Sequence, residues 1–188
     1  MAKHFNLADL FELVADRVPA RDALVCGEQR ATFGELEQRA NQLAHYLASQ
    51  GVGAGDHVGL YLYNCNEYLE GMLACFKIRA VPINVNYRYV DEELLYIFDN
   101  ADMVACIHHL EFAPHIAEVI GSVPDLKTLV YVGDGSGADA SRIDSVEYER
   151  AIAGQDADRD FPERCLLYTS PSPRDSCIHL VCRLLLEK

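Results

Sequence analysis

From Thr32 onward, helical and extended apolar patterns alternate along the chain, and this alternation restricts the fold more than any other feature. Residues Val58 to Leu62 form a nearly continuous apolar run, which is typical of a strand buried on both faces of a parallel sheet. Similar short runs follow at residues 80–85, 103–108 and 128–133, with helical patterns between them. The sequence therefore predicts an α/β fold with a doubly wound, mostly parallel sheet flanked by helices.

The chain before this alternation predicts one helix and two short strands. Asn6 is suited to cap a first helix. Its apolar stripe would consist of Leu7, Leu10, Phe11 and Val14. Pro19 would end this helix, and two strands would follow around the turn Gly27–Glu28.

The second helix has the strongest local signals. Thr32-Phe-Gly-Glu35 matches a capping box, and Gly51 is a natural residue for the helix to end at. The inward face would consist of Leu36, Ala40, Leu43, Ala44 and Leu47.

Later helices are predicted between the apolar runs. Asn64 and Glu67 would cap a helix whose inner face holds Leu69, Leu73, Phe76 and neighbouring small residues. Further helices are expected from Asp91 to Asn100, from Glu111 to Ile120, and over residues 146–154.

The composition of the chain limits the kinds of binding partner and the cellular compartment that we expect. A formal net charge of −13 disfavours nucleic acid, because no basic stripe offsets it. No apolar run approaches the roughly 20 residues that cross a bilayer. Cys26, Cys65, Cys75 and Cys106 lie scattered in apolar segments without metal-ligand spacing, as small buried residues of a reducing compartment do. We therefore expect a cytoplasmic protein.

Two clusters could carry chemistry, and each has a plainer interpretation. The loop Gly133–Gly137 follows a strand as phosphate-binding loops do, but Asp134 would repel a phosphate, which favours a surface turn. His108, His109 and His115 lie near Cys106 and Glu111. Adjacent histidines on a strand point in opposite directions, so solvated or capping histidines are favoured over a zinc site.

A third segment lies where a strand is expected to end. Asn84, Asn86, Tyr87, Arg88 and Tyr89 follow one another there, and ligands of open α/β sheets bind at the carboxyl ends of strands. The alternative is that these side chains only organise the loop and cap the next helix. The residues themselves show neither a nucleophile elbow nor a Walker loop.

Residues 32–102 resemble the amino-terminal region of the adenylate-forming acyl-CoA synthetases of the AMP-binding superfamily. The resemblance rests on T-F-G-E-L-x-x-R-A-N-x-L-A at Thr32 to Ala44, G-D-H-V-G-L at Gly55 to Leu60, and G-M-L-A-C-F-K-I-R-A-V-P-I-N at Gly71 to Asn84. N-Y-R-Y and N-A-D complete it, and P-I-N-V-N-Y-R-Y is most similar to the fatty-acyl or steroid-side-chain branch. Weaker similarity extends the match to residues 6–164.

The resemblance implies a two-step ligase reaction that needs ATP, Mg²⁺ and CoA, with a small carboxylic acid as substrate. The family's glycine-rich phosphate loop is expected just after Arg164. None of the family's nucleotide motifs lies within residues 1–164, so no catalytic, cofactor-binding or metal-binding residue is assigned.

After Arg164 the sequence departs from the family. Tyr168-Thr-Ser170 matches the opening of the phosphate loop, but Pro171-Ser-Pro-Arg-Asp175 replaces its glycines and removes N–H donors. Residues 165–188 match, in one reading frame, the translation of a short-read sequencing adapter. We therefore expect residues 1–164 to be the N-terminal part of a synthetase domain, and residues 165–188 to be an artefact that includes Cys165, Cys177 and Cys182.

Two functions remain open from the sequence. The first is a truncated acyl-CoA synthetase, inactive as it stands and poorly stable because its sheet is incomplete. The alternative is a standalone α/β binding or interaction module without catalysis. The acyl substrate and the oligomeric state are not indicated.

Overall fold

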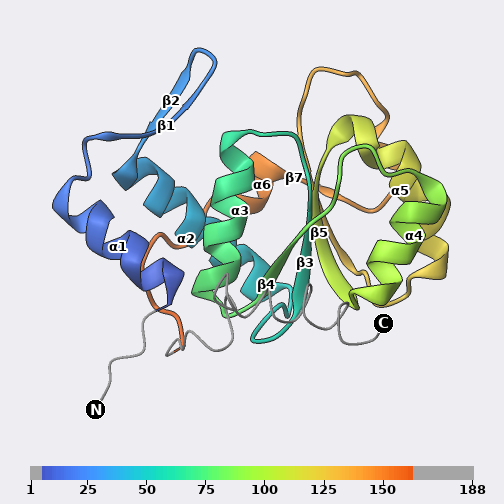
Figure 1. The fold of residues 1–188 in the computed structure, drawn as a ribbon, viewed down its shortest axis with the longest axis horizontal. Coiled ribbons are helices and arrows are strands. Elements are labelled where there is room, and N and C mark those ends of the chain that lie inside the picture. The colour runs from blue at the N-terminus through green and yellow to red at the C-terminus, as the bar shows by residue number, and fades with distance from the viewer. Residues whose placement is uncertain (1–5, 163–188) are drawn as a thin grey trace, which may run out of the picture.

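The computed structural model describes residues 6–162, which form a small hairpin sheet and a five-stranded sheet (Figure 1). The hairpin pairs β1 (Asp22–Cys26) with β2 (Gln29–Thr32) in antiparallel orientation. In the large sheet the order is β4-β3-β5-β6-β7, and all pairs are parallel. Its strands are β3 (His57–Tyr61), β4 (Val81–Asn84), β5 (Met103–His109), β6 (Thr128–Val132) and β7 (Val146–Glu147). The predicted parallel α/β sheet is confirmed.

Helices cover both faces of the large sheet (Figure 1). One face packs against α2 (Phe33–Ser49), α3 (Asn66–Lys77) and α6 (Tyr148–Ile152). The other packs against α4 (Asp91–Asn100) and α5 (Ala113–Val119). The remaining helix, α1 (Leu7–Arg17), lies outside this sandwich against α2 and α3.

Two predicted helices differ from the observed elements. Residues 146–154 were expected to be one helix, but Val146–Glu147 pairs with β6 as a short strand before α6 begins. The helix expected from Glu111 to Ile120 is divided into a 3₁₀ turn (Leu110–Phe112), α5 and a second 3₁₀ turn (Ile120–Ser122). A third 3₁₀ turn spans Ala140–Arg142. Helical periodicity does not distinguish such short elements, because each contains fewer than about two helical turns.

The predicted second helix is confirmed in detail. The Thr32 hydroxyl accepts from the Glu35 N–H, and the Glu35 carboxylate accepts from the Thr32 N–H, so both halves of the capping box are present. All five predicted inward residues are buried. The chain leaves the helix through Gly51, whose φ of 89° lies in the left-handed region that glycine tolerates.

The first helix is capped as predicted but faces the other way. Asn6 caps it through the Ala8 N–H at 2.8 Å. Leu10 and Val14, expected to lie inward, are 46% and 43% exposed, and the buried positions are Ala8, Glu12 and Ala15. Leu7 is also exposed. The predicted apolar stripe is therefore wrong at three of its four positions, and Phe11 is half-buried against Phe33. The buried face of α1 instead carries Glu12, which pairs with Lys77 of α3.

The third helix also differs from its prediction. Its N-cap is Cys65, without a side-chain hydrogen bond, so Asn64 and Glu67 do not cap it as expected. Leu69 is exposed and Leu73 half-buried, whereas Phe76 is buried as predicted.

Small residues set the packing of α3 on the sheet. Gly71, Ala74 and Cys75 lie on its buried face. A Cβ at Gly71 would stand 2.9 Å from Leu60 Cδ2 and 3.3 Å from Ile107 Cδ1, so a larger residue there would force these two side-chain ends to shift. The small residues expected on the inner face are therefore buried, whereas Leu69 is exposed.

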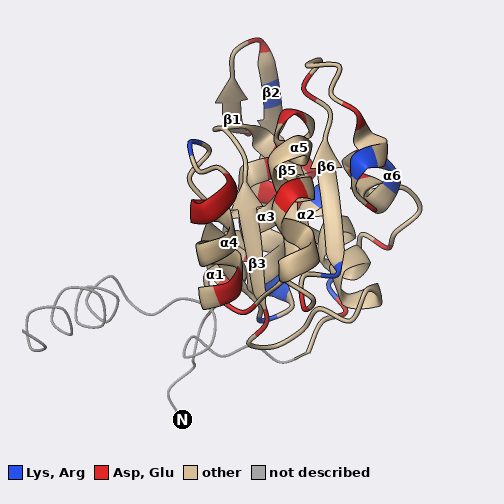
Figure 2. Cartoon of the chain, turned by 90° about the vertical axis from the view of Figure 1, so that its right-hand side faces the viewer, with Lys and Arg blue, Asp and Glu red and all other residues tan. Residues whose placement is uncertain are grey.

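The burial of the cysteines agrees only in part with what their apolar surroundings in the sequence predict. Cys75 and Cys106 are buried as expected, whereas Cys26 and Cys65 are half-exposed. Acidic residues lie on several helices and loops in Figure 2, and the described residues on the side shown form no continuous band of Lys and Arg.

Candidate functional site

The candidate site lies at the carboxyl edge of the large sheet, where the chain reverses its winding. After β3 the chain crosses to the edge strand β4, and it then returns past β3 to form β5 on the other side. The helices after β3 and β5 cover opposite faces, so the two loops diverge at this point (Figure 1). In open parallel sheets this is the place where ligands bind.

His109 joins the two diverging loops. Its Nδ1 accepts from the Tyr63 N–H at 3.1 Å, so in the neutral ring the proton must lie on Nε2. The ring packs against Tyr63 and Phe112, with centroids at 5.3 and 6.1 Å. Burial lowers the pKa of His109, against the opposing effect of Asp134. The neutral ring of His109, the last residue of β5, thus accepts a hydrogen bond from the loop that follows β3.

His108 lies on the opposite face of β5 and is fully buried. Its Nδ1 is 2.8 Å from the His109 carbonyl oxygen, so Nδ1 carries the proton. Burial lowers the pKa of His108 to about 4. The prediction that these two histidines diverge is confirmed, but the prediction that they are solvated is wrong, since β5 is a central strand.

Asp134 ties together the loops after β5 and β6. Its carboxylate accepts from the Glu111 N–H at 2.7 Å and from the Ser136 N–H at 2.8 Å. Burial alone would raise the pKa of Asp134, but the hydrogen bonds from Ser136 and Glu111 hold it below its usual value. The loop Gly133–Gly137 is a largely exposed turn, as predicted, and Asp134 fastens it.

The segment after β4 lines a hollow of about 810 Å³ at the same edge. The hollow is lined by Leu62, Tyr63, Asn64, Tyr68, Asn84, Val85, Asn86, Tyr87, Tyr89 and Ile97. No Asp, Glu, Lys or Arg is among these residues. Tyr63 and Tyr87 pack at 4.9 Å between ring centroids, and the Arg88 guanidinium lies 5.4 Å from the Tyr87 ring. Such a lining suits an uncharged or weakly polar group.

The structure also supports the alternative that side chains of this segment organise the loop itself. The Tyr61 hydroxyl donates to the Tyr89 carbonyl oxygen, and Asn86 Oδ1 accepts from the Arg88 N–H at 3.1 Å. These bonds shape the loop from within. Asn84 and Asn86 do not cap α4, whose N-cap is Val90.

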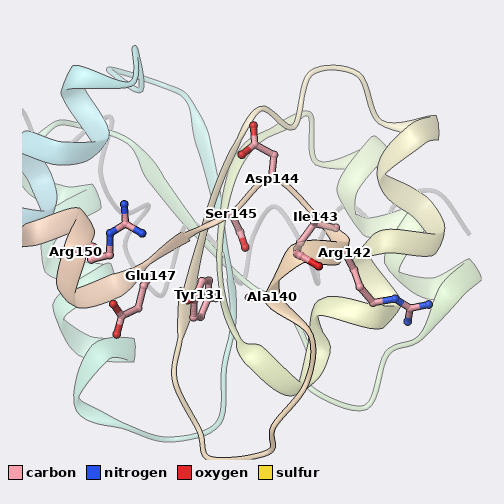
Figure 3. A pocket seen from close by; sticks show the side chains of 9 residues that line it. Tyr131, Ala140, Arg142, Ile143, Asp144, Ser145, Glu147 and Arg150 are labelled. Atoms are coloured by element: carbon pink, nitrogen blue, oxygen red, sulfur yellow. The ribbon is translucent and has the colours of Figure 1, made fainter.

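Two other features form no converging site. A hollow of about 500 Å³ lies between β6 and α6, where Figure 3 shows Arg142 and Arg150 on opposite sides. Within residues 6–162 no set of three His, Cys, Asp or Glu side chains could hold a metal ion. His115 lies instead 3.8 Å from Asp91 on the surface.

A charged cluster that the sequence did not reveal lies at the other end of α3. Lys77, fully buried, places Nζ 2.7 Å from Glu12 and 2.9 Å from Glu37. Arg159 donates from Nε to the same Glu37 oxygen at 2.7 Å and binds Asp16 with both terminal nitrogens. We call these five residues the ionic clamp. A lysine at the end of an apolar helix gave the only hint of it.

Comparison with known proteins identifies the family. The profile described as "AMP-binding enzyme" matches residues 11–172. The chain belongs to the AMP-binding enzyme family. The resemblance seen in the sequence is thereby confirmed, and the match runs past Arg164 into the segment whose origin stays a prediction.

Relatives and solved structures agree with this assignment. The 3-oxocholest-4-en-26-oate–CoA ligase of Rhodococcus rhodochrous is 50% identical over 169 residues, covering 87% of the chain and 30% of the relative. A medium/long-chain-fatty-acid–CoA/3-oxocholest-4-en-26-oate–CoA ligase of Mycobacterium marinum is 48% identical, with the same coverage of each chain. The fold matches the anthranilate CoA ligase AuaEII at a TM-score of 0.78 and 23% identity, over 88% of this chain and 31% of that one.

The extent of these matches limits what they establish. The chain spans about 30% of the length of the curated relatives. Among residues 6–162, no helix is long and apolar enough to cross a membrane. The family and the fold are thus established, and the activity of the intact protein is a separate question.

Proposed function

We propose that this chain is the N-terminal part of a cytoplasmic, ATP-dependent acyl-CoA ligase for a fatty acid or a steroid side-chain acid. The observation that carries this proposal is the 50% identity to a ligase named for 3-oxocholest-4-en-26-oate. The second relative, at 48% identity, is named for both medium/long-chain fatty acids and the same steroid acid. The substrate class therefore includes both.

In the intact enzyme the carboxylate would attack the α-phosphate of ATP and release pyrophosphate. The CoA thiol would then attack the acyl-adenylate, giving the thioester and AMP. Mg²⁺ supplies charge stabilisation for the transferring phosphates.

The described residues do not form a triphosphate site. At the carboxyl edge, Asp134 is ionised and already accepts two backbone N–H groups, and Glu111 lies beside it. A polyanion would be repelled there, and we derive no catalytic step from these residues. The nearby hollow, lined mainly by tyrosines and asparagines, also has no Lys or Arg among its lining residues.

We further propose that residues 165–188, outside the described part, are translated adapter sequence, and that the chain as given is inactive. The match of that segment to an adapter in one frame supports the first point. The small share of each relative that the chain covers supports the second.

The test is to sequence the gene from intact genomic DNA and to express the complete reading frame. We expect a glycine-rich phosphate loop soon after Arg164, and carboxylate-dependent pyrophosphate release with both octanoate and 3-oxocholest-4-en-26-oate. The 188-residue chain should release none under the same conditions. A stop codon shortly after Arg164, or an intact protein that binds partners but activates no acid, would favour the noncatalytic module.

A further inference from the structure

The hollow at the carboxyl edge lies between two loops that contacts within the chain hold in place. We call it the tyrosine hollow, because its lining includes Tyr63, Tyr68, Tyr87 and Tyr89. The Tyr63 N–H holds the loop after β3 by donating to His109, and the Tyr61 hydroxyl holds the loop after β4 by donating to the Tyr89 carbonyl oxygen. The volume of about 810 Å³ lies within the range of about 300–1,000 Å³ that is typical of sites for small organic ligands.

The charges beside the tyrosine hollow disfavour a charged ligand of either sign. The Arg88 guanidinium lies 5.4 Å from the Tyr87 ring, where it makes a cation–π contact and would repel a second cation. At the other wall, burial raises the pKa of Tyr63, and the nearby Glu111 and Asp134 carboxylates raise it further. These carboxylates would repel an anion. The lining itself contains no Asp, Glu, Lys or Arg, so the ligand should be uncharged.

Two side-chain amides in the lining offer hydrogen bonds to a ligand. Asn64 and Asn84 are exposed, and within residues 6–162 neither side-chain amide makes a hydrogen bond to the protein. Each amide has two N–H donors and a carbonyl acceptor. A plain hydrocarbon chain would displace water from these groups without replacing its hydrogen bonds, which is unfavourable. A ligand with a carbonyl oxygen would accept from them instead.

The aromatic walls favour a rigid ligand. Tyr63 and Tyr87 are 40% and 42% exposed, and their ring centroids lie 4.9 Å apart. Aromatic faces gain most from contact with other flat or compact ring systems. A rigid ring system also loses less conformational freedom on binding than a flexible chain does.

We propose that the tyrosine hollow binds an uncharged, rigid ring system that carries a carbonyl oxygen, such as a steroid 4-en-3-one. Tyr63 and Tyr87 would contact the rings, and the amide of Asn64 or Asn84 would donate to the oxygen. This inference rests on the proposed function, because the ring end of a steroid acid would occupy the hollow in the intact ligase. Tyr87 then determines specificity for ring-containing acids and has no role with straight-chain acids.

The first test measures binding without catalysis. The 188-residue chain is dialysed to equilibrium against testosterone, an uncharged steroid 4-en-3-one, and the bound fraction gives Kd. Tyr87→Ala should raise Kd about fivefold, because one aromatic wall is lost. The matched control is Tyr96→Ala on α4, a 67% exposed tyrosine outside the lining, which should bind testosterone as the wild type does.

A second variant tests the amide and the preference for a neutral lining. Asn84→Asp keeps the size of the side chain but removes two donors and adds a negative charge, so Kd should rise about tenfold. Asn100→Asp, an exposed change at the end of α4, is the control and should leave Kd unchanged. Circular dichroism shows whether each variant keeps the wild-type fold. No testosterone binding by the wild-type chain, or equal binding by folded Tyr87→Ala and Asn84→Asp, would overturn the proposal.

The kinetic test uses the complete ligase and two acids. Tyr87→Ala should raise the KM for 3-oxocholest-4-en-26-oate about fivefold and leave the KM for octanoate unchanged, because only the first acid has rings to contact the hollow. A purely structural role of Tyr87 would change both values alike, and that result would overturn the proposal. An inactive wild-type ligase whose hollow still binds testosterone would instead refute the proposed function and leave the binding site standing.

Discussion

Two polar networks stand at opposite ends of the large sheet, and they are built differently. The ionic clamp gathers charges at the end of α3, including the buried Lys77, Glu12 and Glu37, through contacts between residues up to 143 positions apart in the sequence. The carboxyl edge relies on His109, Asp134 and backbone N–H groups, and its two histidines are kept neutral by burial. The clamp thus joins helices through paired charges, whereas the edge aligns loops through backbone N–H groups that donate to His109 and to the ionised Asp134.

This contrast has an energetic consequence. Removing one member of a buried charge set leaves its partners uncompensated, whereas removing a loop hydrogen bond leaves groups that water can reach. The clamp should therefore be the more sensitive network to substitution, and the edge the more sensitive to mild acid.

The largest expected effect is on the clamp. Lys77→Met should lower the free energy of unfolding by about 3–5 kcal/mol, because Glu12 and Glu37 lose their buried cation. Urea denaturation followed by circular dichroism measures the change. The exposed control Lys127→Met should lie within about 0.5 kcal/mol of wild type.

If Lys77→Met does not fold, the second substitution Glu12→Gln in the same chain should restore part of the stability. A Lys77→Met chain as stable as wild type would remove the distinction between the two networks.

The carboxyl edge should determine how the stability of the chain depends on pH. His108 has its pKa lowered by burial from 6.5 to about 4, so the unfolded chain binds the proton first. The contribution of neutral His108 to the free energy of unfolding is complete above about pH 6.5. It is lost as the pH falls toward 4, at up to about 1.4 kcal/mol per pH unit. His108→Gln should flatten the stability profile in this window, measured by urea unfolding at several pH values.

The matched control is His115→Gln on the surface of α5, which should keep the wild-type slope. A flat profile in the unmodified chain between pH 6.5 and 4 would show that His108 is not the acid-sensitive group.

Removing the Asp134 carboxylate, which holds the loops after β5 and β6 together, should have a smaller effect on the free energy of unfolding. Asp134→Ala leaves the Glu111 and Ser136 N–H groups without their acceptor and should cost about 1–2 kcal/mol. Exchange of these two amides should also become faster. Asp125→Ala, an exposed change before β6, is the control, and an equal loss in both variants would contradict the assigned role.

The smallest expected effect is the coupling free energy between the ionic clamp and the carboxyl edge. Lys77→Met and Asp134→Ala should be additive within about 0.3–0.5 kcal/mol in a double-mutant cycle, because the two residues share no partner. A coupling above about 1 kcal/mol would mean that the sheet transmits strain between its ends.

Prediction from the sequence succeeded where local and tertiary preferences agree. The capping box at Thr32 and the inward face of α2 combine strong local chemistry with burial on the sheet. Prediction was wrong for most of the apolar stripe of α1, and for Leu69 and the capping residues of α3, and it missed the charged residues Glu12 and Lys77 on the buried faces of these helices. Apolar spacing measures hydrophobicity along a helix and cannot detect a partner charge that arrives from another helix.

The candidate site shows the same division. The place of residues 84–89 at a strand end was predictable, because parallel strands bring their carboxyl ends to one edge. The burial and the opposite tautomers of His108 and His109 were not, since they depend on the strand order β3-β5-β6 around them.

The sequence by itself determined the family, the parallel α/β class and the capped second helix, because these depend on motifs and periodicities within short stretches. Only the tertiary structure decided that Lys77, Glu37 and Arg159 meet, that α1 turns its leucines outward, and that Asp134 fastens a loop. The physical reason is that a buried charge is tolerable only beside its counter-charge. That partner can come from any distance along the chain.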